Sequence, residues 1–248
     1  DPKKEKKTLF IWPEGVFSGY SYIEILVFKD LILKKFSNNH LILLGVNTLD
    51  PKTEKFYNSM ILVNNELKIL NSYNKQKLVP FGEFLPLEFI LNKFGLKKIT
   101  EGHGSFKKGN KKINIRIDQL SILPLICYEV IFTSFIQEAN LDTNLIVNIS
   151  EDAWFGNTIG PEQHYVKSIF RAIESGTFFL RSANKGISAI IDNKGKPIKE
   201  LKRNEAGNIE FVVPLIKLKN NKNDLIFIVL LITYLLIFNI YKLKKYEK

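Results

Sequence analysis

The sequence predicts an α/β fold, and three observations support this prediction. Short apolar runs bounded by turn residues recur along the chain, as is typical of buried strands. Two polar segments, Asn64-Asn65-Glu66 and Asp192-Asn193-Lys194-Gly195, are typical of hairpin turns. A helical apolar pattern follows Gly160. With 248 residues, of which 45% are hydrophobic, the chain is long enough for one large α/β domain.

The individual elements follow from these apolar runs. The expected strands are residues 9–12, 41–46, 60–63, 67–70, 122–126, 145–149 and 178–181. The expected helix begins near Pro161, because proline suits the first helical position. Its apolar residues recur at positions i, i+3, i+4 and i+7, which predicts an amphipathic helix. These residues are Val166, Ile169, Phe170 and Ile173.

An uncharged run near the C-terminus predicts a transmembrane helix. Seventeen residues separate Asp224 from Lys242 without a charge, at the short end of the ~17 to 25 residues that a spanning helix takes. The alternative is a buried core helix, but the run is apolar on every face. Lysines flank it at positions 217, 219 and 222 and again at 242, 244, 245 and 248. Lysines at both ends can extend to the two membrane interfaces.

The basic flanks also predict an orientation and a division of the chain. The C-terminal flank is the more densely basic, so we expect it on the cytoplasmic side and the catalytic domain on the other side. The expected parts are a catalytic domain over residues 1–218, a transmembrane helix with a short juxtamembrane segment over 219–241, and a basic cytoplasmic tail over 242–248.

Charge and metal-ligand spacing restrict the possible partners. The net charge of +11 favours anionic lipid headgroups, although scattered surface lysines are the plainer explanation. Nucleic-acid binding is not expected, because no helix carries basic residues along one face. His40, His103 and His164 are too scattered for a metal site, and Cys127 has no cysteine partner. We expect His164 to make a structural hydrogen bond. The sequence therefore predicts no metal and no cofactor.

Three apolar runs end in residues that acyl-transfer chemistry uses. Cys127, the single cysteine, ends one run and is followed by Tyr128 and Glu129. Glu14 ends another run, and a third segment, residues 74–84, carries lysines and a further glutamate. A lone free thiol is commonly a buried structural residue. The acid and the base at the other two strand ends favour a nucleophile.

The chemistry of a thiol nucleophile assigns roles to these residues. A thiol has a reference pKa of roughly 8.5, so attack needs a carboxylate to take its proton, and Glu14 fits that role. Negative charge then develops on the carbonyl oxygen, and each fixed donor to it contributes about 3 kcal/mol. Lys75 and the backbone amide of Tyr128 are candidate donors. Spacing alone does not separate Lys75 from Lys77.

These motifs resemble the nitrilase or carbon-nitrogen hydrolase superfamily, whose catalytic set is Glu, Lys and Cys in that order. The resemblance implies that Glu14, Lys75 and Cys127 are catalytic, and it is what selects Lys75. Within the superfamily the chain resembles the apolipoprotein N-acyltransferases over most of its length, from about residue 9. The matching segments are Trp12-Pro13-Glu14, Lys75 with residues 78–83, residues 126–129, residues 152–156 and residues 160–164.

The resemblance implies a fold, a site and substrates. The fold is a four-layer α-β-β-α sandwich. Glu83 holds the lysine, and Tyr128 and Glu129 shape the acyl pocket, although both glutamates could instead be salt-bridge or capping residues. The activity is transfer of an acyl chain from a membrane phospholipid, through a thioester on Cys127, to the α-amino group of the N-terminal diacylglyceryl-cysteine of a lipoprotein. The location is the bacterial inner membrane, with the catalytic domain on the periplasmic side.

Two departures from this branch affect the expectations. Glu151 stands where asparagine is expected, which changes the hydrogen bonding of the following loop. The chain opens at Asp1 without methionine, whereas the branch places membrane helices and an opening strand earlier. We therefore expect the C-terminal part of a larger protein, a domain that lacks its first strand, and weak or no turnover by these residues alone.

Three other functions stay open. A membrane-anchored amidase of the nitrilase family would use the same three residues, with water as the second acceptor, to hydrolyse a carbon-nitrogen bond. A tethered binding module would carry an inactive site. A structural membrane protein would not depend on Cys127.

Overall fold

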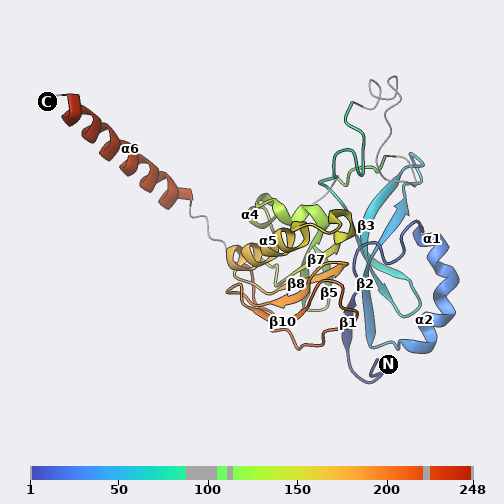
Figure 1. Cartoon of the computed structure of the whole chain (residues 1–248). Helices are drawn as coiled ribbons and strands as arrows, with labels where there is room; N and C mark the ends of the chain where they lie inside the picture. The colour runs from blue at the N-terminus through green and yellow to red at the C-terminus, as the bar shows by residue number, and fades with distance from the viewer. Residues whose placement is uncertain (1, 88–104, 111–113, 220–223, 247–248) are drawn as a thin grey trace.

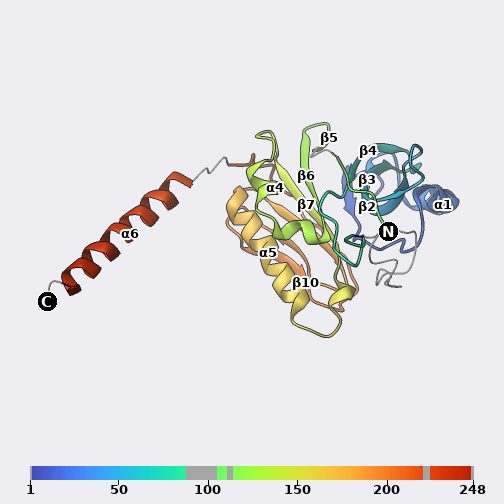
Figure 2. The same ribbon diagram turned by 90° about the horizontal axis from the view of Figure 1, so that it is seen from above.

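Two β-sheets face each other in the centre of the molecule, and helices cover the outer side of each sheet (Figure 1). The computed structural model describes residues 2–87, 105–110, 114–219 and 224–246. Figure 2, which looks from above, shows the same succession of helix, sheet, sheet and helix. This order of layers agrees with the expected α-β-β-α arrangement.

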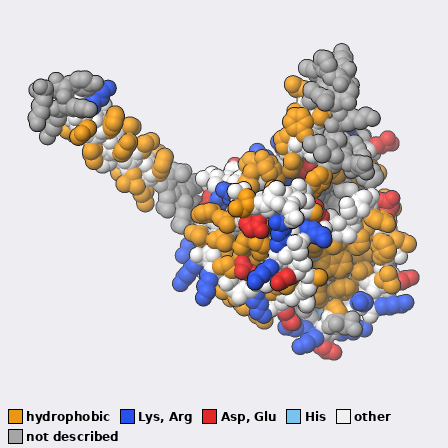
Figure 3. Space-filling model, in the orientation of Figure 1, with side chains coloured by type: hydrophobic (Ala, Val, Ile, Leu, Met, Phe, Trp, Pro, Cys, Tyr) orange, Lys and Arg blue, Asp and Glu red, His pale blue; other side chains and the backbone are white. Residues whose placement is uncertain are grey.

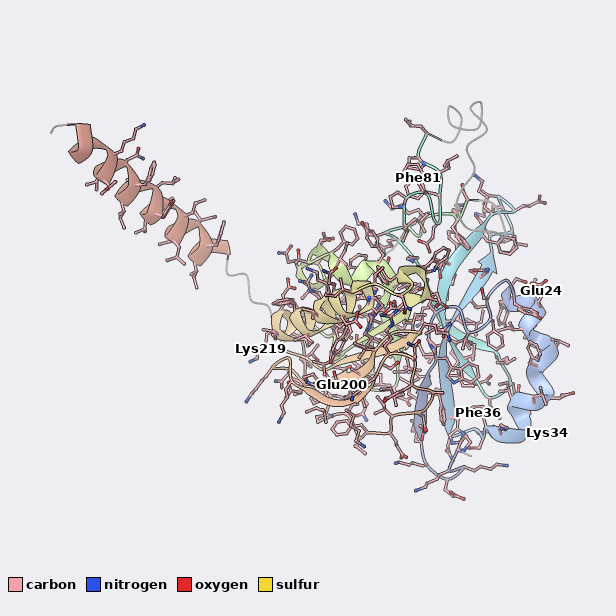
Figure 4. All side chains as sticks on the ribbon, in the orientation of Figure 1. Glu24, Lys34, Phe36, Phe81, Glu200 and Lys219 are labelled. Carbon is pink, nitrogen blue, oxygen red and sulfur yellow. The ribbon has the colours of Figure 1, made fainter. Side chains whose placement is uncertain are left out.

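The first sheet has four strands in the order β1-β2-β3-β4. The β1 strand runs parallel to β2, and the other neighbours are antiparallel. The strands are β1 (Thr8–Ile11), β2 (His40–Leu49), β3 (Phe56–Asn64) and β4 (Ile69–Asn74). Its outer face is covered by α1 (Tyr22–Ile25), the 3₁₀ turn η1 (Leu26–Phe28) and α2 (Lys29–Lys35). At the end of α2, Phe36 packs edge-on against Phe10 of β1, with ring centroids 5.0 Å apart (Figure 4).

The second sheet has six strands in the order β10-β9-β8-β7-β6-β5. Its central strands β6, β7 and β8 are parallel and the outer pairs are antiparallel. The strands are β5 (Ile115–Ile117), β6 (Leu120–Ile126), β7 (Leu145–Glu151), β8 (Phe179–Asn184), β9 (Ser188–Ile191) and β10 (Pro197–Leu201). Its outer face carries α4 (Ser134–Gln137) and α5 (Gly160–Ser175). Two 3₁₀ turns, η3 (Cys127–Ile131) and η4 (Asp152–Phe155), follow β6 and β7 directly.

Three apolar clusters hold the layers together. The middle cluster lies between the sheets and includes Leu43 and Met60 from the first sheet and Val147 from the second. The other two clusters join each sheet to its helices. The sheets approach closely at Gly45 of β2, where an added Cβ would lie 3.0 Å from Ile149 Cδ1. A larger residue there would force the two sheets apart beside the strand ends that carry the polar side chains.

The seven strands expected from the apolar runs are confirmed, and so are both hairpin turns. Asn64 closes the first turn by accepting hydrogen bonds from the N–H groups of Glu66 and Lys68 at its side-chain oxygen. Asp192 does the same in the second turn with Lys194 and Lys196. The helical segment formed by α1, η1 and α2 was not expected, because its sequence is apolar on its outer face as well as on its inner face. Ile23, Val27 and Leu31 are all exposed there.

The helix expected after Gly160 is confirmed as α5, but three of its four expected apolar positions, Val166, Phe170 and Ile173, are exposed. Ile169 packs against the core, and the side packed on the sheet also carries polar residues. These are His164, Ser168, Arg171 and Ser175. Of these, His164 meets polar partners beneath the helix, and they lie beside Cys127.

The C-terminal apolar run forms α6 (Asp224–Tyr246). It extends away from the sheets in Figure 1, and its side chains described at positions 226–242 are all exposed. Hydrophobic side chains dominate its surface in Figure 3. None of the helices among the described residues is long and apolar enough to cross a bilayer, so the predicted transmembrane span is not confirmed. Lys222 and Lys248, two of the flanking lysines, lie outside the described residues.

Candidate active site

Lys75 lies between two carboxylates, Glu14 and Glu83, where strands of the first sheet end. Its Nζ is 2.8 Å from Glu83 Oε1 and 3.5 Å from Glu14 Oε1. The lysine side chain is 1% exposed and each glutamate side chain is 13% exposed. Burial alone would lower the pKa of Lys75, but the charges of Glu14 and Glu83 outweigh it and hold this pKa above its ordinary value. The ammonium therefore stays charged at neutral pH.

Asn58 of β3 joins the same two carboxylates from the other side. Its Nδ2 donates to Glu14 Oε1 and to Glu83 Oε1, both at 2.7 Å. The amide and the ammonium thus alternate with the two carboxylate oxygens in a closed ring of four groups. Sequence reasoning missed Asn58, because a lone asparagine within a strand has no distinctive pattern. This ring fixes both carboxylates relative to Lys75.

The backbone around Lys75 is held from both sides. Its N–H donates to Asn58 O at 2.9 Å, and its own carbonyl accepts from the N–H of Gly109 at 2.8 Å. Lys77 differs: its Nζ lies 5.3 Å from the centre of the Phe132 ring. The structure therefore separates the two lysines that spacing could not, and places Lys75 with the carboxylates.

Cys127 begins η3 directly after β6 and has an unusual backbone. Its φ of 48° lies in the left-handed region, where a residue with a Cβ costs on the order of 1 to 3 kcal/mol. Burial, followed by the charge of Glu14, raises the pKa of the Cys127 thiol to about 12, while Lys75 opposes this change. The thiol is therefore protonated at neutral pH and needs a base to become a nucleophile.

The side chain of Glu129, a residue of η3, is fully buried and receives four hydrogen bonds. Its Oε2 accepts from the N–H of Ile126 at 2.8 Å. Its Oε1 accepts from the N–H groups of Gln76 and Lys77 and from the Tyr73 hydroxyl. These contacts tie the segment after β4 to the turn that carries Cys127. Tyr128 lies on this turn with its ring edge-on to Phe132, centroids 5.1 Å apart.

Glu129 is expected to make stability depend on pH. Burial, the largest cause, raises the pKa of Glu129 to about 7, against the lowering effect of its N–H donors. The native state therefore holds this proton more tightly than the unfolded chain, so the contribution is full below about pH 4.5 and is lost as pH rises toward 7. We expect the free energy of unfolding to fall by up to about 3 kcal/mol over that window.

The measurement is urea denaturation at pH 5, 6 and 7 for the wild type and Glu129→Gln. The glutamine has no titrating proton, so the free energy of unfolding of Glu129→Gln should change less with pH. We expect it to be lower than that of the wild type at all three pH values. Parallel pH curves for the two proteins would contradict this assignment of the pKa.

Glu151, where asparagine was expected, links Glu14 to the turn η4. Its N–H donates to Glu14 Oε2 at 3.0 Å. Its carboxylate accepts from the N–H of Ala153 at 3.1 Å and from Asn184 Nδ2 at 2.7 Å. Glycine is favoured at position 15 because its φ of 77° lies in the left-handed region, and an added Cβ would also lie 2.2 Å from Glu151 Oε2. Burial, with a smaller contribution from Glu14, raises the pKa of Glu151.

A buried polar cluster lies behind Cys127 and was not foreseen as a unit. His164 Nε2 lies 3.2 Å from Cys127 O, and its Nδ1 lies 3.0 Å from Asp152 Oδ1. Asp152 Oδ2 accepts from Arg181 Nη2 at 2.7 Å. The expected structural hydrogen bond of His164 is confirmed. Within the described residues no group of three or more His, Cys, Asp or Glu side chains is arranged to hold a metal; His103 lies outside them.

Comparisons with known proteins agree with this fold and extend over most of the chain. A profile of the carbon-nitrogen hydrolase family matches residues 2–219. The apolipoprotein N-acyltransferase of Rickettsia typhi is 38% identical over 215 residues, which are 86% of this chain and 43% of that protein. The apolipoprotein N-acyltransferase of Rickettsia prowazekii is 37% identical, over 85% of this chain and 42% of that protein. The chain thus spans about two fifths of the length of these relatives.

Solved structures share the fold at lower identity. Nit3 of Saccharomyces cerevisiae, a member of branch 10 of the nitrilase superfamily, aligns with a TM-score of 0.57 and 20% identity, covering 80% of this chain and 74% of that one. XC1258 of Xanthomonas campestris, a CN-hydrolase superfamily protein with an arsenic adduct in its active site, aligns with a TM-score of 0.58 and 17% identity, covering 82% and 77%. The extent of the family match establishes that this chain belongs to the carbon-nitrogen hydrolases.

Proposed function

We propose that this chain is the catalytic part of an apolipoprotein N-acyltransferase, with Glu14, Lys75 and Cys127 as its catalytic residues. The observation that carries the proposal is the buried Lys75 held against Glu14 and Glu83, close enough to Cys127 for each charge to affect the other's pKa. The relatives named apolipoprotein N-acyltransferase support the substrates.

In the first step the Cys127 thiol attacks an ester carbonyl of a membrane phospholipid. Glu14 takes the thiol proton as the bond from Sγ to the carbonyl carbon forms, which suits a thiol whose pKa is raised to about 12. The ester C–O bond then breaks, Glu14 gives the proton to the leaving oxygen, and a lysophospholipid departs. A thioester remains on Cys127.

In the second step the α-amino group of the diacylglyceryl-cysteine of a lipoprotein attacks the thioester. Its proton passes through Glu14 to the departing sulfur, and an amide forms. Lys75 stabilises the oxyanion in both steps: an ammonium has three protons, and two of them face Glu14 and Glu83. Glu83 holds Lys75, Tyr128 shapes the acyl pocket, and the buried Glu129 shapes it indirectly by fixing the turn that carries Cys127.

The test of this function is intact mass spectrometry of the detergent-solubilised protein mixed with phospholipid vesicles and no lipoprotein. We expect an added acyl mass that hydroxylamine removes and that Cys127→Ala lacks. Because the 248-residue chain alone is expected to show weak or no turnover, the full-length protein is the second sample. If the folded full-length protein gains no acyl mass but hydrolyses short-chain amides, an amidase is the correct function instead.

We further propose that the protein resides at the bacterial inner membrane, with α6 as its C-terminal attachment and the catalytic domain on the periplasmic side. The exposed hydrophobic side chains of α6 support this attachment, because such a surface is unfavourable in water. We expect the chain to stay with membranes after an alkaline carbonate wash and to be released when residues 224–248 are deleted. Equal release of both forms would contradict attachment through α6.

A further inference from the structure

We infer that His164 is a positioning residue that aims the Tyr128 backbone N–H at the oxyanion of the acyl-transfer step. The inference rests on the proposed function, because it concerns how the Cys127 acyl-enzyme forms. It assigns a role to a buried polar cluster that the two chemical steps do not otherwise use.

A single peptide group joins Cys127 to Tyr128. A trans peptide is planar, and its C=O and N–H point in opposite directions; the described residues contain no cis peptide. Whatever fixes the carbonyl oxygen of Cys127 therefore fixes the direction of the Tyr128 N–H. This single peptide carries both the nucleophile and the candidate oxyanion donor.

The carbonyl oxygen of Cys127 is held from the side of α5 and β7. His164 Nε2 lies 3.2 Å from it, and Asn148 Nδ2 lies 3.5 Å from it. A carbonyl oxygen only accepts, so the histidine nitrogen that faces it carries the hydrogen. The N–H of Tyr128 accordingly points away from α5. Tyr128 also precedes the first residue of η3 that donates within the turn, so the hydrogen bonds of the turn itself do not use its N–H.

The ring of His164 is itself locked in place. Its Nδ1 contacts Asp152 Oδ1 at 3.0 Å and Arg181 Nη2 at 3.1 Å, and Asp152 accepts a further hydrogen bond from Ser150 at 2.6 Å. Asp152 is 1% exposed, Arg181 3% and His164 5%. Arg181 also donates to the carbonyl of Ile187 on the other side. Such a fully buried network holds one geometry, since any rearrangement would leave a charged group without a partner.

The strained backbone of Cys127 explains why such support is needed. With a φ of 48°, Cys127 has a backbone conformation that a residue with a Cβ does not prefer. Glu129 holds the Ile126 N–H ahead of the cysteine, and His164 holds the carbonyl after it. The two contacts therefore hold the backbone on both sides of the Cys127 side chain. A hydrogen bond to the carbonyl also polarises the peptide and strengthens its N–H as a donor.

The test separates reactions that build an oxyanion from those that do not. Acylation of Cys127 by a p-nitrophenyl ester forms the Sγ–C bond, passes the thiol proton to Glu14, places negative charge on the carbonyl oxygen and releases p-nitrophenol. Alkylation by iodoacetamide needs the same thiol and the same base but no oxyanion. We expect His164→Leu to slow the acylation burst by about 10- to 100-fold and to leave the alkylation rate unchanged.

The matched variant is His164→Gln, whose side-chain amide can donate to the carbonyl at a similar reach and should restore most of the burst rate. The KM for the ester should stay constant across the three proteins, because only the transition state uses the N–H. An unchanged burst in His164→Leu, or an equal loss of burst and alkylation, would overturn the inference. If the wild type bursts with the ester but takes no acyl group from phospholipid, the proposed donor is wrong while the role of His164 stands.

Discussion

Replacing Lys75 by methionine is expected to lower the free energy of unfolding by about 3 to 5 kcal/mol, the usual cost of breaking a buried ion pair by removing one partner. The side chain is 1% exposed and lies between Glu14 and Glu83. Methionine fills a similar volume but leaves two carboxylates facing each other with Asn58 as their shared donor. Acylation of Cys127 should fall at least about 100-fold, since the proposed donor to the oxyanion is lost as well.

Lys77→Met is the control for this prediction. Its ammonium lies over the Phe132 ring, a contact worth about 0.5 to 1 kcal/mol at an exposed site. Urea denaturation of both variants gives the comparison. Adding Glu83→Gln to Lys75→Met removes one unpaired charge and should recover stability without recovering activity. Equal stabilities of Lys75→Met and Lys77→Met would mean that the ring of four groups does not depend on the ammonium.

The strands were predictable because each is an apolar run between turn residues, and a buried strand is readily recognised in that form. The same reasoning put Glu14, Lys75 and Cys127 at strand ends, where side chains of different strands can meet. It could not choose between Lys75 and Lys77. That choice depends on where the chain leaves β4: Lys75 still bonds to Asn58 of β3 through its backbone N–H, whereas the Lys77 ammonium lies over the Phe132 ring.

The inner face of α5 was not predictable from its periodicity. An apolar stripe normally marks the buried side of a helix, yet here Val166 and Phe170 are exposed and His164 is buried. His164 can be buried because Arg181 of β8 and Asp152 after β7 meet it, and Ser150 and Asn148 of β7 bond to those two residues in turn. Those residues come from separate strands, so no single segment of sequence shows that they form one network.

The supporting contacts of the site were missed for the same reason. Asn58 and Glu129 each connect segments more than 20 residues apart along the chain. Their importance depends on the donors and acceptors that surround them after folding. Sequence reasoning noted Glu129 beside Cys127 and took its role in the acyl pocket from the resemblance, and it did not name Asn58.

Replacing Glu14 by glutamine is expected to change the pH dependence of every reaction of Cys127. In the proposed mechanism Glu14 takes the thiol proton, so alkylation of the wild type by iodoacetamide should vary little with pH between about 6 and 8. Burial raises the pKa of the thiol to about 12, and the charge of Glu14 adds to that effect. Without the carboxylate the reaction depends on the small thiolate fraction, which rises tenfold for each pH unit below the thiol pKa.

The expected result for Glu14→Gln is therefore a rate that is lower by about 100- to 10,000-fold near pH 7 and climbs steeply with pH. Removing the Glu14 charge also lowers the thiol pKa somewhat, so the two proteins should converge in alkaline solution. Both alkylation and acylation should show this slope, which separates the base from His164, whose loss should affect acylation alone. A Glu14→Gln protein whose alkylation rate is as insensitive to pH as that of the wild type would show that another group takes the proton. Glu151, whose backbone N–H already donates to Glu14, would then be the next residue to replace, because its carboxylate is the candidate for that group.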